Sequence, residues 1–289
     1  MRRILILFSL ALAGHLYGDW LFDSTAKTLT ECDSEGVAIA DNPWVFSVTS
    51  SKVVDGVYNL TIKYKTIGAA DKLDLQTPIH GQSAVITSLA DDFLKHNTSK
   101  ALLTSIKLPL TLTSIGKEAF ANHSKLVHVE PFLPDSIQKI GNEAFYSTAI
   151  TNNLRIGHDG NPVTVGSSAF SRCLASSADL GSGVTALSFD MFKGCSKLSS
   201  VKLSDALTSI GQQAFENCTA LTTIEPLLPD SVTAIGSRAF YSVPLKANCL
   251  SIKAQNKPIS ILGSTFYISG ITNIVFGDGQ VTLSSDSFM

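Results

Sequence analysis

The sequence predicts a repeat solenoid that is mainly β, and three observations lead to that fold class. A short phrase recurs at a nearly constant interval along most of the chain. Between its copies, apolar and polar residues alternate with the two-residue period of half-buried strands. Hydrophobic residues make up 44% of the 289 residues and charged residues only 16%, a balance that allows a large core and suits strands and tight turns.

The recurring phrase is Ile-Gly-x-x-Ala-Phe, which ends in a Phe in every copy, degenerate copies included. These residues are Phe120, Phe145, Phe170, Phe192, Phe215, Phe240, Phe266 and Phe288. The intervals between them are 25, 25, 22, 23, 25, 26 and 22 residues. So narrow a period predicts a stack of about eight units, in which each unit buries its apolar face against its neighbours.

A larger duplication is superimposed on the repeat. Residues 112–147 are identical to residues 207–242 at 21 of 36 positions, which indicates that a block of four units was copied once. Lys107 then corresponds to Lys202, and Glu130 corresponds to Glu225. We therefore expect two similar groups of charged side chains on one face, four units apart.

Each unit is expected to follow the same path. Residues 198–203 (LSSVKL) alternate as a half-buried strand does, and a following Leu-Pro or Pro-Asp-Ser ends such a strand because Pro has no N–H to donate. A second extended stretch, such as residues 207–210, leads to the Gly, which relieves the turn. We expect the next segment, x-x-Ala-Phe-x-x-Cys, to form one short helical turn on the convex side, with the Phe pointing inward.

These motifs resemble the BspA-type, or Treponema pallidum-type, leucine-rich repeats. The full signature Ile-Gly-x-x-Ala-Phe-x-x-Cys occurs at 210–218, and the likeness covers about residues 73–289. The resemblance implies a leucine-rich-repeat array in an exported, typically bacterial protein, and relatives with known roles tend to bind proteins of a host or of neighbouring cells. Some units depart from the signature at the Gly or the Cys position, at Ser188, Leu262, His123, Thr148, Val243 and Ser269.

Residues 1–18 are expected to be a signal peptide. Arg2 and Arg3 precede a ten-residue apolar stretch, and small residues suited to cleavage follow at Ala13 and Gly18. Ten residues are too few to span a bilayer, which takes about 20; a buried first strand is the alternative reading. The mature protein is then exported to the periplasm, the outer surface or the medium, with no integral membrane segment.

Residues 19–85 are expected to form a small β-rich N-terminal cap, and residues 86–289 the leucine-rich-repeat domain. A solenoid must shield its first unit from water and from edge pairing, which favours a cap over the alternative of an independent binding module. A degenerate leading repeat at about 73–94 joins the two parts. Within the cap, turn-forming Asp-Asn-Pro and Asp-Gly separate three short predicted strands, at 20–22, 45–48 and 58–64.

The residues provide no support for an enzyme, a metal site or a cofactor. Cys173, Cys195 and Cys218 each lie three residues after a repeat Phe, which predicts a ladder of buried, reduced thiols; a disulfide or a metal site is the alternative. The sequence has no Cys-x-x-Cys pair, and its histidines are scattered over different units. Nucleophile-elbow, P-loop and His-Glu-x-x-His motifs are absent. A net charge of −2 argues against a nucleic-acid partner.

The candidate site is the solvent side of the strands that are expected to form a concave sheet. Its side chains are polar and of mixed charge, so an ordinary solvated face is the alternative reading. They are also poor in aromatics, which favours either weak binding there or a site elsewhere. The candidate partner-binding residues are Lys107, His128, Glu130, Asn153, Arg155, Asp179, Lys202, Thr223, Glu225 and Ser251.

Three functions remain open at this point. The first is a non-enzymatic exported protein that binds a protein partner, a host or envelope component, with attachment to host components as one form of it. The second is a periplasmic structural or assembly protein that associates through its C-terminal unit, since the chain stops at Phe288-Met289 inside the repeat phrase. The third is a binder of an apolar ligand, held where the cap meets the array.

Overall fold

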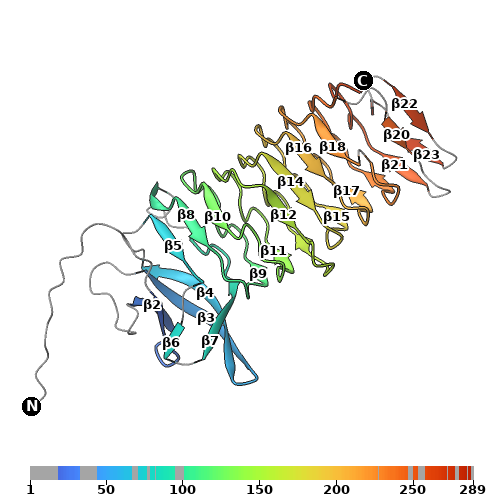
Figure 1. Ribbon diagram of the computed structural model, residues 1–289. Coiled ribbons are helices and arrows are strands. Elements are labelled where there is room, and N and C mark those ends of the chain that lie inside the picture. Colours follow the sequence, from blue (N-terminus) through green and yellow to red (C-terminus); the bar gives the residue numbers. More distant parts are fainter. Residues whose placement is uncertain are drawn as a thin grey trace, which may run out of the picture.

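The chain is described by a computed structural model, in which a cap at the N-terminal end leads into a long stack of similar turns (Figure 1). The structure describes residues 19–32, 44–66, 71–76, 79–81, 83–94, 101–226, 228–246, 250–252, 258–271, 273–276, 280–284 and 286–287. The expected signal peptide at 1–18 lies outside these residues. No helix in the described part of the chain is long and apolar enough to cross a membrane.

Two rows of parallel strands run along the stack, and each turn of the chain, here called a rung, contributes one strand to each row (Figure 1). The first row consists of β5 (Lys72–Asp74), β8 (Ser105–Lys107), β10 (His128–Glu130), β12 (Leu154–Ile156), β14 (Ser177–Leu180), β16 (Ser200–Lys202), β18 (Thr223–Glu225), β20 (Leu250–Ile252) and β22 (Ile274–Phe276). The second row consists of β7 (Ala84–Leu89), β9 (Ser114–Ile115), β11 (Lys139–Ile140), β13 (Thr164–Val165), β15 (Ala186–Leu187), β17 (Ser209–Ile210), β19 (Ala234–Ile235), β21 (Ile259–Ile261) and β23 (Val281–Leu283). The predicted mainly-β solenoid of about eight turns is confirmed.

The first row is interrupted after β10 and after β18, so its strands form sheets of three, four and two strands. At the first interruption the side-chain amide of Asn152 takes the place of a strand. Val129 N donates to Asn152 Oδ1 at 3.2 Å, and Asn152 Nδ2 donates to Val129 O at 3.3 Å. The amide uses one of its N–H donors and its oxygen acceptor here, and so bonds both backbone groups of Val129.

The Gly of the repeat phrase is required by the close approach of neighbouring rungs. A Cβ on Gly141 would lie 2.4 Å from the backbone N of Lys117, and one on Gly236 would lie 2.3 Å from that of Gln212. Both contacts are to backbone atoms that cannot swing aside. Ser188, which departs from the phrase, turns its hydroxyl to the rung before it and donates to Gly166 O at 2.8 Å.

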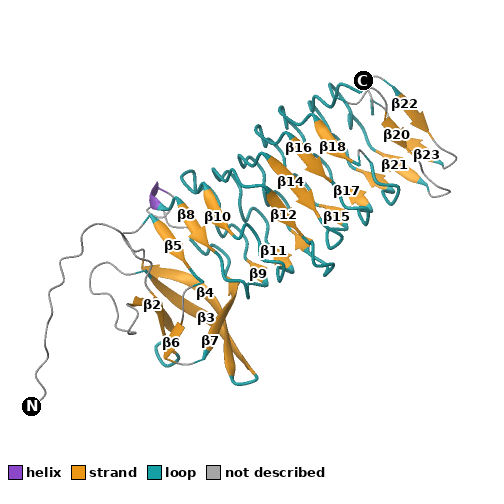
Figure 2. Cartoon of the chain, viewed as in Figure 1, coloured by secondary structure: helices purple, strands orange, loops and turns teal. Residues whose placement is uncertain are grey.

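The segment after this Gly is a run of tight turns, so the expected short helical turn is wrong. In the rung of Phe145, Ala144 N donates to Gly141 O and Tyr146 N donates to Glu143 O, each three residues back. Glu143 and Ser147 have positive φ angles of 56° and 54°, which a right-handed helix excludes. Among the described residues, helix is confined to positions 101–102 (Figure 2).

Hydrogen bonds between rungs explain why these turns do not wind into helix. The N–H groups of Glu143, Phe145 and Ser147 donate to carbonyls of the next rung at 2.8–2.9 Å. Every second N–H of the segment is used in this way, and an α-helix would need the same groups for bonds within the segment. The third side of the solenoid is therefore a ladder of stacked turns.

The repeat Phe side chains form one continuous stack inside the solenoid. From Phe120 to Phe266, successive rings lie 5.1–5.7 Å apart with interplanar angles of 3–16°. All seven rings are at most 4% exposed. The inward orientation predicted for the Phe is confirmed for these seven, and Phe288 lies outside the described residues.

The predicted thiol ladder is also present, because Cys173, Cys195 and Cys218 are buried and free. The sulfur atoms of Cys173 and Cys195 lie 3.5 Å apart, and Cys218 Sγ donates to Phe192 O at 3.0 Å. The contact with Cys195, together with burial, raises the pKa of Cys173, and burial raises the pKa of Cys195. In other rungs His123 and Thr148 fill the same position and bond the carbonyl of their own Phe.

The N-terminal cap is a β-meander that continues directly into the second strand row. It contains β1 (Asp19–Asp23), β2 (Thr28–Cys32), β3 (Val45–Val54), β4 (Val57–Thr66) and β6 (Ile79–Gly81). The three strands predicted here are confirmed, although β3 and β4 are longer than expected. Because β4 pairs in parallel with β7, the cap covers the first edge of the array. The division at 85/86 falls inside β7 and remains a proposal.

Aromatic side chains fill the junction between cap and array. The ring centroid of Phe46 lies 5.3 Å from that of Trp20, 6.1 Å from that of Trp44 and 5.3 Å from that of Phe93. The centroids of Phe93 and Phe120 are 5.7 Å apart. The Phe stack of the rungs therefore continues into the core of the cap. The degenerate leading repeat is present as β5 and β7, which pair with β8 and β9.

Candidate partner-binding face

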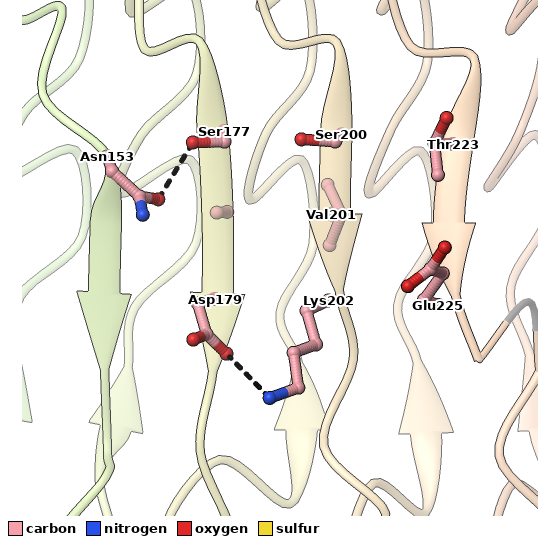
Figure 3. A pocket seen from close by; sticks show the side chains of 9 residues that line it. Asn153, Ser177, Asp179, Ser200, Val201, Lys202, Thr223 and Glu225 are labelled. Atoms are coloured by element: carbon pink, nitrogen blue, oxygen red, sulfur yellow. Dashed lines mark hydrogen bonds and ion pairs between the residues drawn. The ribbon is translucent and has the colours of Figure 1, made fainter.

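The candidate site is the solvent side of the first strand row, which we call the strand face. Inward and outward residues alternate along the strands: in β10 and β18 the middle residue is buried between two exposed neighbours, and in β12 the middle residue, Arg155, is the exposed one. The side chains of the strand face therefore form two rows that run along the solenoid, across the strands. Figure 3 shows part of this face, from Asn153 to Glu225.

One of the two, the charged row, carries an ionised side chain on every strand from β5 to β18. Strand pairing places its members side by side within each sheet. The charged row consists of Asp74, Lys107, Glu130, Arg155, Asp179, Lys202 and Glu225. Its members on β5, β8 and β10 correspond to those on β14, β16 and β18, so two similar charged groups are present, as the duplication predicts.

Ion pairs connect members of the charged row to one another and to adjacent loops. Lys107 Nζ lies 3.0 Å from Asp74 Oδ2, and Lys202 Nζ lies 3.9 Å from Asp179 Oδ1. Arg155 instead contacts Asp135 at 2.9 Å. The pairs of Lys202 with Asp179 and of Arg155 with Asp135 are largely exposed, so the Coulomb energy of each is modest in water, whereas Asp74 is buried beside Lys107.

Asp179 has contacts with side chains from two other rungs. His158 Nε2 lies 3.5 Å from Asp179 Oδ1 and 3.1 Å from its backbone oxygen. Oδ1 is buried and has no hydrogen-bond partner among the described residues, and Lys202 Nζ lies 3.9 Å from it. The carboxylate therefore lies between the imidazole of His158 and the ammonium group of Lys202, which come from different rungs.

The second row of the strand face, the hydroxyl row, is mostly uncharged. Ser177 Oγ donates to Asn153 Oδ1 at 2.9 Å, a contact drawn in Figure 3. Ser200 and Thr223 continue this row across the next two strands. The hydroxyl row consists of Lys72, Ser105, His128, Asn153, Ser177, Ser200 and Thr223.

Two shallow depressions lie on the strand face, each lined by both rows. The larger, of about 350 Å³, extends from Asn153 to Glu225 across four strands (Figure 3). The smaller, of about 230 Å³, extends from Lys72 to Glu130 across three strands. Both are open and polar, unlike the enclosed apolar pockets that bind small molecules.

The structure places nine of the ten candidate residues on the strand face, and Ser251 lies in β20, where only the backbone is described. Sequence reasoning missed Asp74 and Lys72 because the leading repeat lacks the full phrase. The alternation in Leu73-Asp-Leu75 was the signal that could have identified them. It also missed Asp135 and His158, which come from loops and approach the face only in the folded chain.

The stacked turns carry a second group of charges, away from the strand face. Lys193 lies 3.7 Å from Asp190 and 3.6 Å from Glu216, and Arg238 lies 3.5 Å from Glu216. Burial raises the pKa of Asp190, and Lys193 opposes that shift. Among the described residues, no group of three or more His, Cys, Asp and Glu side chains could hold a metal ion.

Strand rows, stacked turns and a central Phe stack define the class of protein as a leucine-rich-repeat solenoid. The sequence model of the BspA type leucine rich repeat region matches six copies, over residues 98–173 and 163–289. The chain belongs to this family. The sequence matches no curated protein.

Three solved structures of leucine-rich-repeat proteins match the chain at low sequence identity and with TM-scores below 0.5. A leucine-rich repeat protein from Bacteroides ovatus is 19% identical with a TM-score of 0.49, over 84% of this chain and 78% of that chain. A T. pallidum leucine-rich repeat protein is 18% identical with a TM-score of 0.34, over 81% and 82%. A leucine rich cell surface protein from Faecalibacterium prausnitzii is 18% identical with a TM-score of 0.31, over 81% and 93%.

Proposed function

We propose that the chain is an exported, non-enzymatic protein that binds a protein partner through its strand face. The observation that carries the proposal is the charged row, which presents mixed charges along the face at the regular spacing of the rungs. Charges arranged in this way favour recognition and association rate more than affinity. Attachment to host or envelope components is the form of binding that we propose.

The strand face is a better candidate than a small-molecule site. Its two depressions are shallow and polar, and the junction of cap and array is filled by the side chains of Trp20, Trp44, Phe46 and Phe93. The second candidate function is that of an assembly protein that associates through its last rungs. It is favoured by two apolar side chains there, Val275 and Leu283, which are 53% and 45% exposed.

The test is partner binding by wild type and by Lys202→Glu/Glu225→Lys. Partners are first identified by pull-down from host and envelope proteins, and their affinity is then measured at two salt concentrations. We expect the double reversal to weaken binding, mainly by slowing association, and to reduce its dependence on salt. Thermal stability should change little, since exposed substitutions usually shift it by about 0.5 kcal/mol or less.

Lys139→Glu provides the matched control, because Lys139 is an exposed lysine on the second strand row. It should bind as wild type does. Equal affinity of wild type and the double reversal for every partner found would exclude the strand face as the binding site.

A further inference from the structure

The charges of the charged row alternate in sign without exception. From β5 to β18 the order is negative, positive, negative, positive, negative, positive, negative, although only 16% of the residues in the chain are charged. Opposite charges on neighbouring strands stabilise a sheet slightly. The hydroxyl row, on the same strands, is mostly uncharged, so an outward position on these strands does not have to carry a charge.

An alternating row is complementary to a copy of itself that is displaced by one position. We propose that the strand face binds the strand face of a second copy of this chain, with the two charged rows facing each other. This inference rests on the proposed function, because it names the partner of the same surface. It differs from association through the last rungs, which would use the end of the solenoid.

Symmetry limits how two strand faces can meet. A two-fold axis parallel to the strands places the two solenoids antiparallel and keeps each charged row opposite the other. Because the charge order reads the same from both ends, full overlap would bring like charges together. An axis between the rungs of Arg155 and Asp179 displaces the rows by one rung and brings opposite charges together at every position of the overlap.

This register gives three kinds of ion pair, each formed twice. Arg155 faces Asp179 of the second copy, Glu130 faces its Lys202, and Lys107 faces its Glu225. The side chains of Arg155, Asp179, Lys202 and Lys107 are 54%, 32%, 68% and 37% exposed, and both glutamates are exposed. The register leaves out Asp74, which is 6% exposed and already paired with Lys107.

The contact is expected to be weak and sensitive to salt. Each exposed ion pair contributes little, the depressions between the side chains hold room for water, and screening shortens the range of the charges to about 10 Å at 0.1 M salt. Such a contact suits proteins displayed at high local density, where many weak contacts act together.

Sedimentation equilibrium on the purified full chain at 50 mM and 500 mM salt tests the proposal. We expect a monomer–dimer equilibrium at 50 mM salt, at concentrations of tens to hundreds of micromolar, and monomer at 500 mM salt. Lys202→Glu should weaken the dimer by about tenfold, because the substitution changes two of its six pairs. Glu130→Lys alone should have the same effect.

The double variant Glu130→Lys/Lys202→Glu separates contacts between chains from contacts within one. These residues are three rungs apart, about 14 Å at the strand spacing, so they do not meet in one chain. Within one chain the double variant gives each substituted position a like charge on both neighbouring rungs, so like charges are adjacent four times. In the dimer the double variant restores the ion pair between positions 130 and 202 of the two copies, with the signs exchanged. We therefore expect the double variant to dimerise more strongly than either single variant.

Two results would overturn the proposal. The first is a monomer at every concentration and salt tested. The second is a dimer that Lys202→Glu leaves unchanged or that the double variant fails to restore, which would place the contact elsewhere. Either result leaves the proposed function standing if another protein still binds the strand face, because that binding is measured separately.

Discussion

At the scale of single residues, the repeat is defined by the side chains that must fit between rungs. Phe215 packs 5.5 Å from both Phe192 and Phe240 and is fully buried. Cys195 fills a position beside the same stack, where a small side chain suffices. The Cys position tolerates substitution, since His123 or Thr148 occupies it in other rungs. The Phe position does not vary in the described rungs from Phe120 onward.

The first residue-scale prediction concerns this ring. Phe215→Ala should lower the free energy of unfolding by about 3–5 kcal/mol, since it removes a buried aromatic and leaves a cavity that the rungs cannot close. Phe189→Ala provides the matched control, because Phe189 is 44% exposed, and should cost about 1 kcal/mol or less. If urea titrations showed the same loss of unfolding free energy for both variants, the proposed role of the Phe stack would be wrong.

The second residue-scale prediction concerns the thiols. Cys173, Cys195 and Cys218 should react slowly with a thiol reagent in the folded protein and rapidly in denaturant, because they are buried and the raised pKa values of Cys173 and Cys195 disfavour their thiolates. Peptide mapping by mass spectrometry locates each label. Thr223→Cys, on an exposed position of the strand face, should be labelled quickly, and equally fast labelling of the ladder would show that it is accessible.

At the scale of elements, the stacked turns are the feature that local sequence describes least well. Their residues accept positive φ angles, at Glu118, Asn122, Glu143 and Ser147 among others, and this conformation costs an L-residue about 1–2 kcal/mol. The cost is offset because each such residue donates its N–H to the next rung. The turns are thus stable only as part of a stack.

The element-scale prediction concerns the Gly that begins each run of turns. Gly141→Ala should destabilise the protein by about 1–3 kcal/mol, since its Cβ would meet the backbone of Lys117 at 2.4 Å and force the rungs apart. Lys139→Ala, two residues earlier and exposed, should change stability by about 0.5 kcal/mol or less. Thermal melts of both variants provide the measurement, and a Gly141→Ala variant as stable as wild type would contradict the close approach.

At the scale of the whole molecule, one core runs from the cap through the described rungs. The aromatic contacts pass from Trp20 and Phe46 through Phe93 to the repeat stack without a gap, and β4 joins the cap sheet to the second strand row. Each rung contacts only its neighbours, so stability spreads along the stack. The duplication sets the long-range order of the strand face, since it repeats the same charged group four rungs later.

The sequence by itself determined the rung, its period and its core. A Phe or a Cys at a fixed spacing is visible in the local sequence, and stacking makes every such position equivalent. The sequence alone therefore predicted that the side chains of Phe215 and Cys218 are buried. The strands at 20–22, 45–48 and 58–64 followed from alternation and turn residues in the same way. The outward position of Lys202 and Glu225 followed from the alternation of β16 and β18.

Only the tertiary structure decided the conformation of the turns and the neighbours of the strand face. The turns depend on hydrogen bonds between residues 21 to 25 positions apart, on neighbouring rungs, and no local propensity reports such bonds. The side-chain amide of Asn152 that replaces a strand, and the approach of Asp135 to Arg155 and of His158 to Asp179, depend on how loops fold back. Strand pairing added Asp74 to the row of alternating charges by placing it beside Lys107, because the register between distant segments is set by packing of the whole stack.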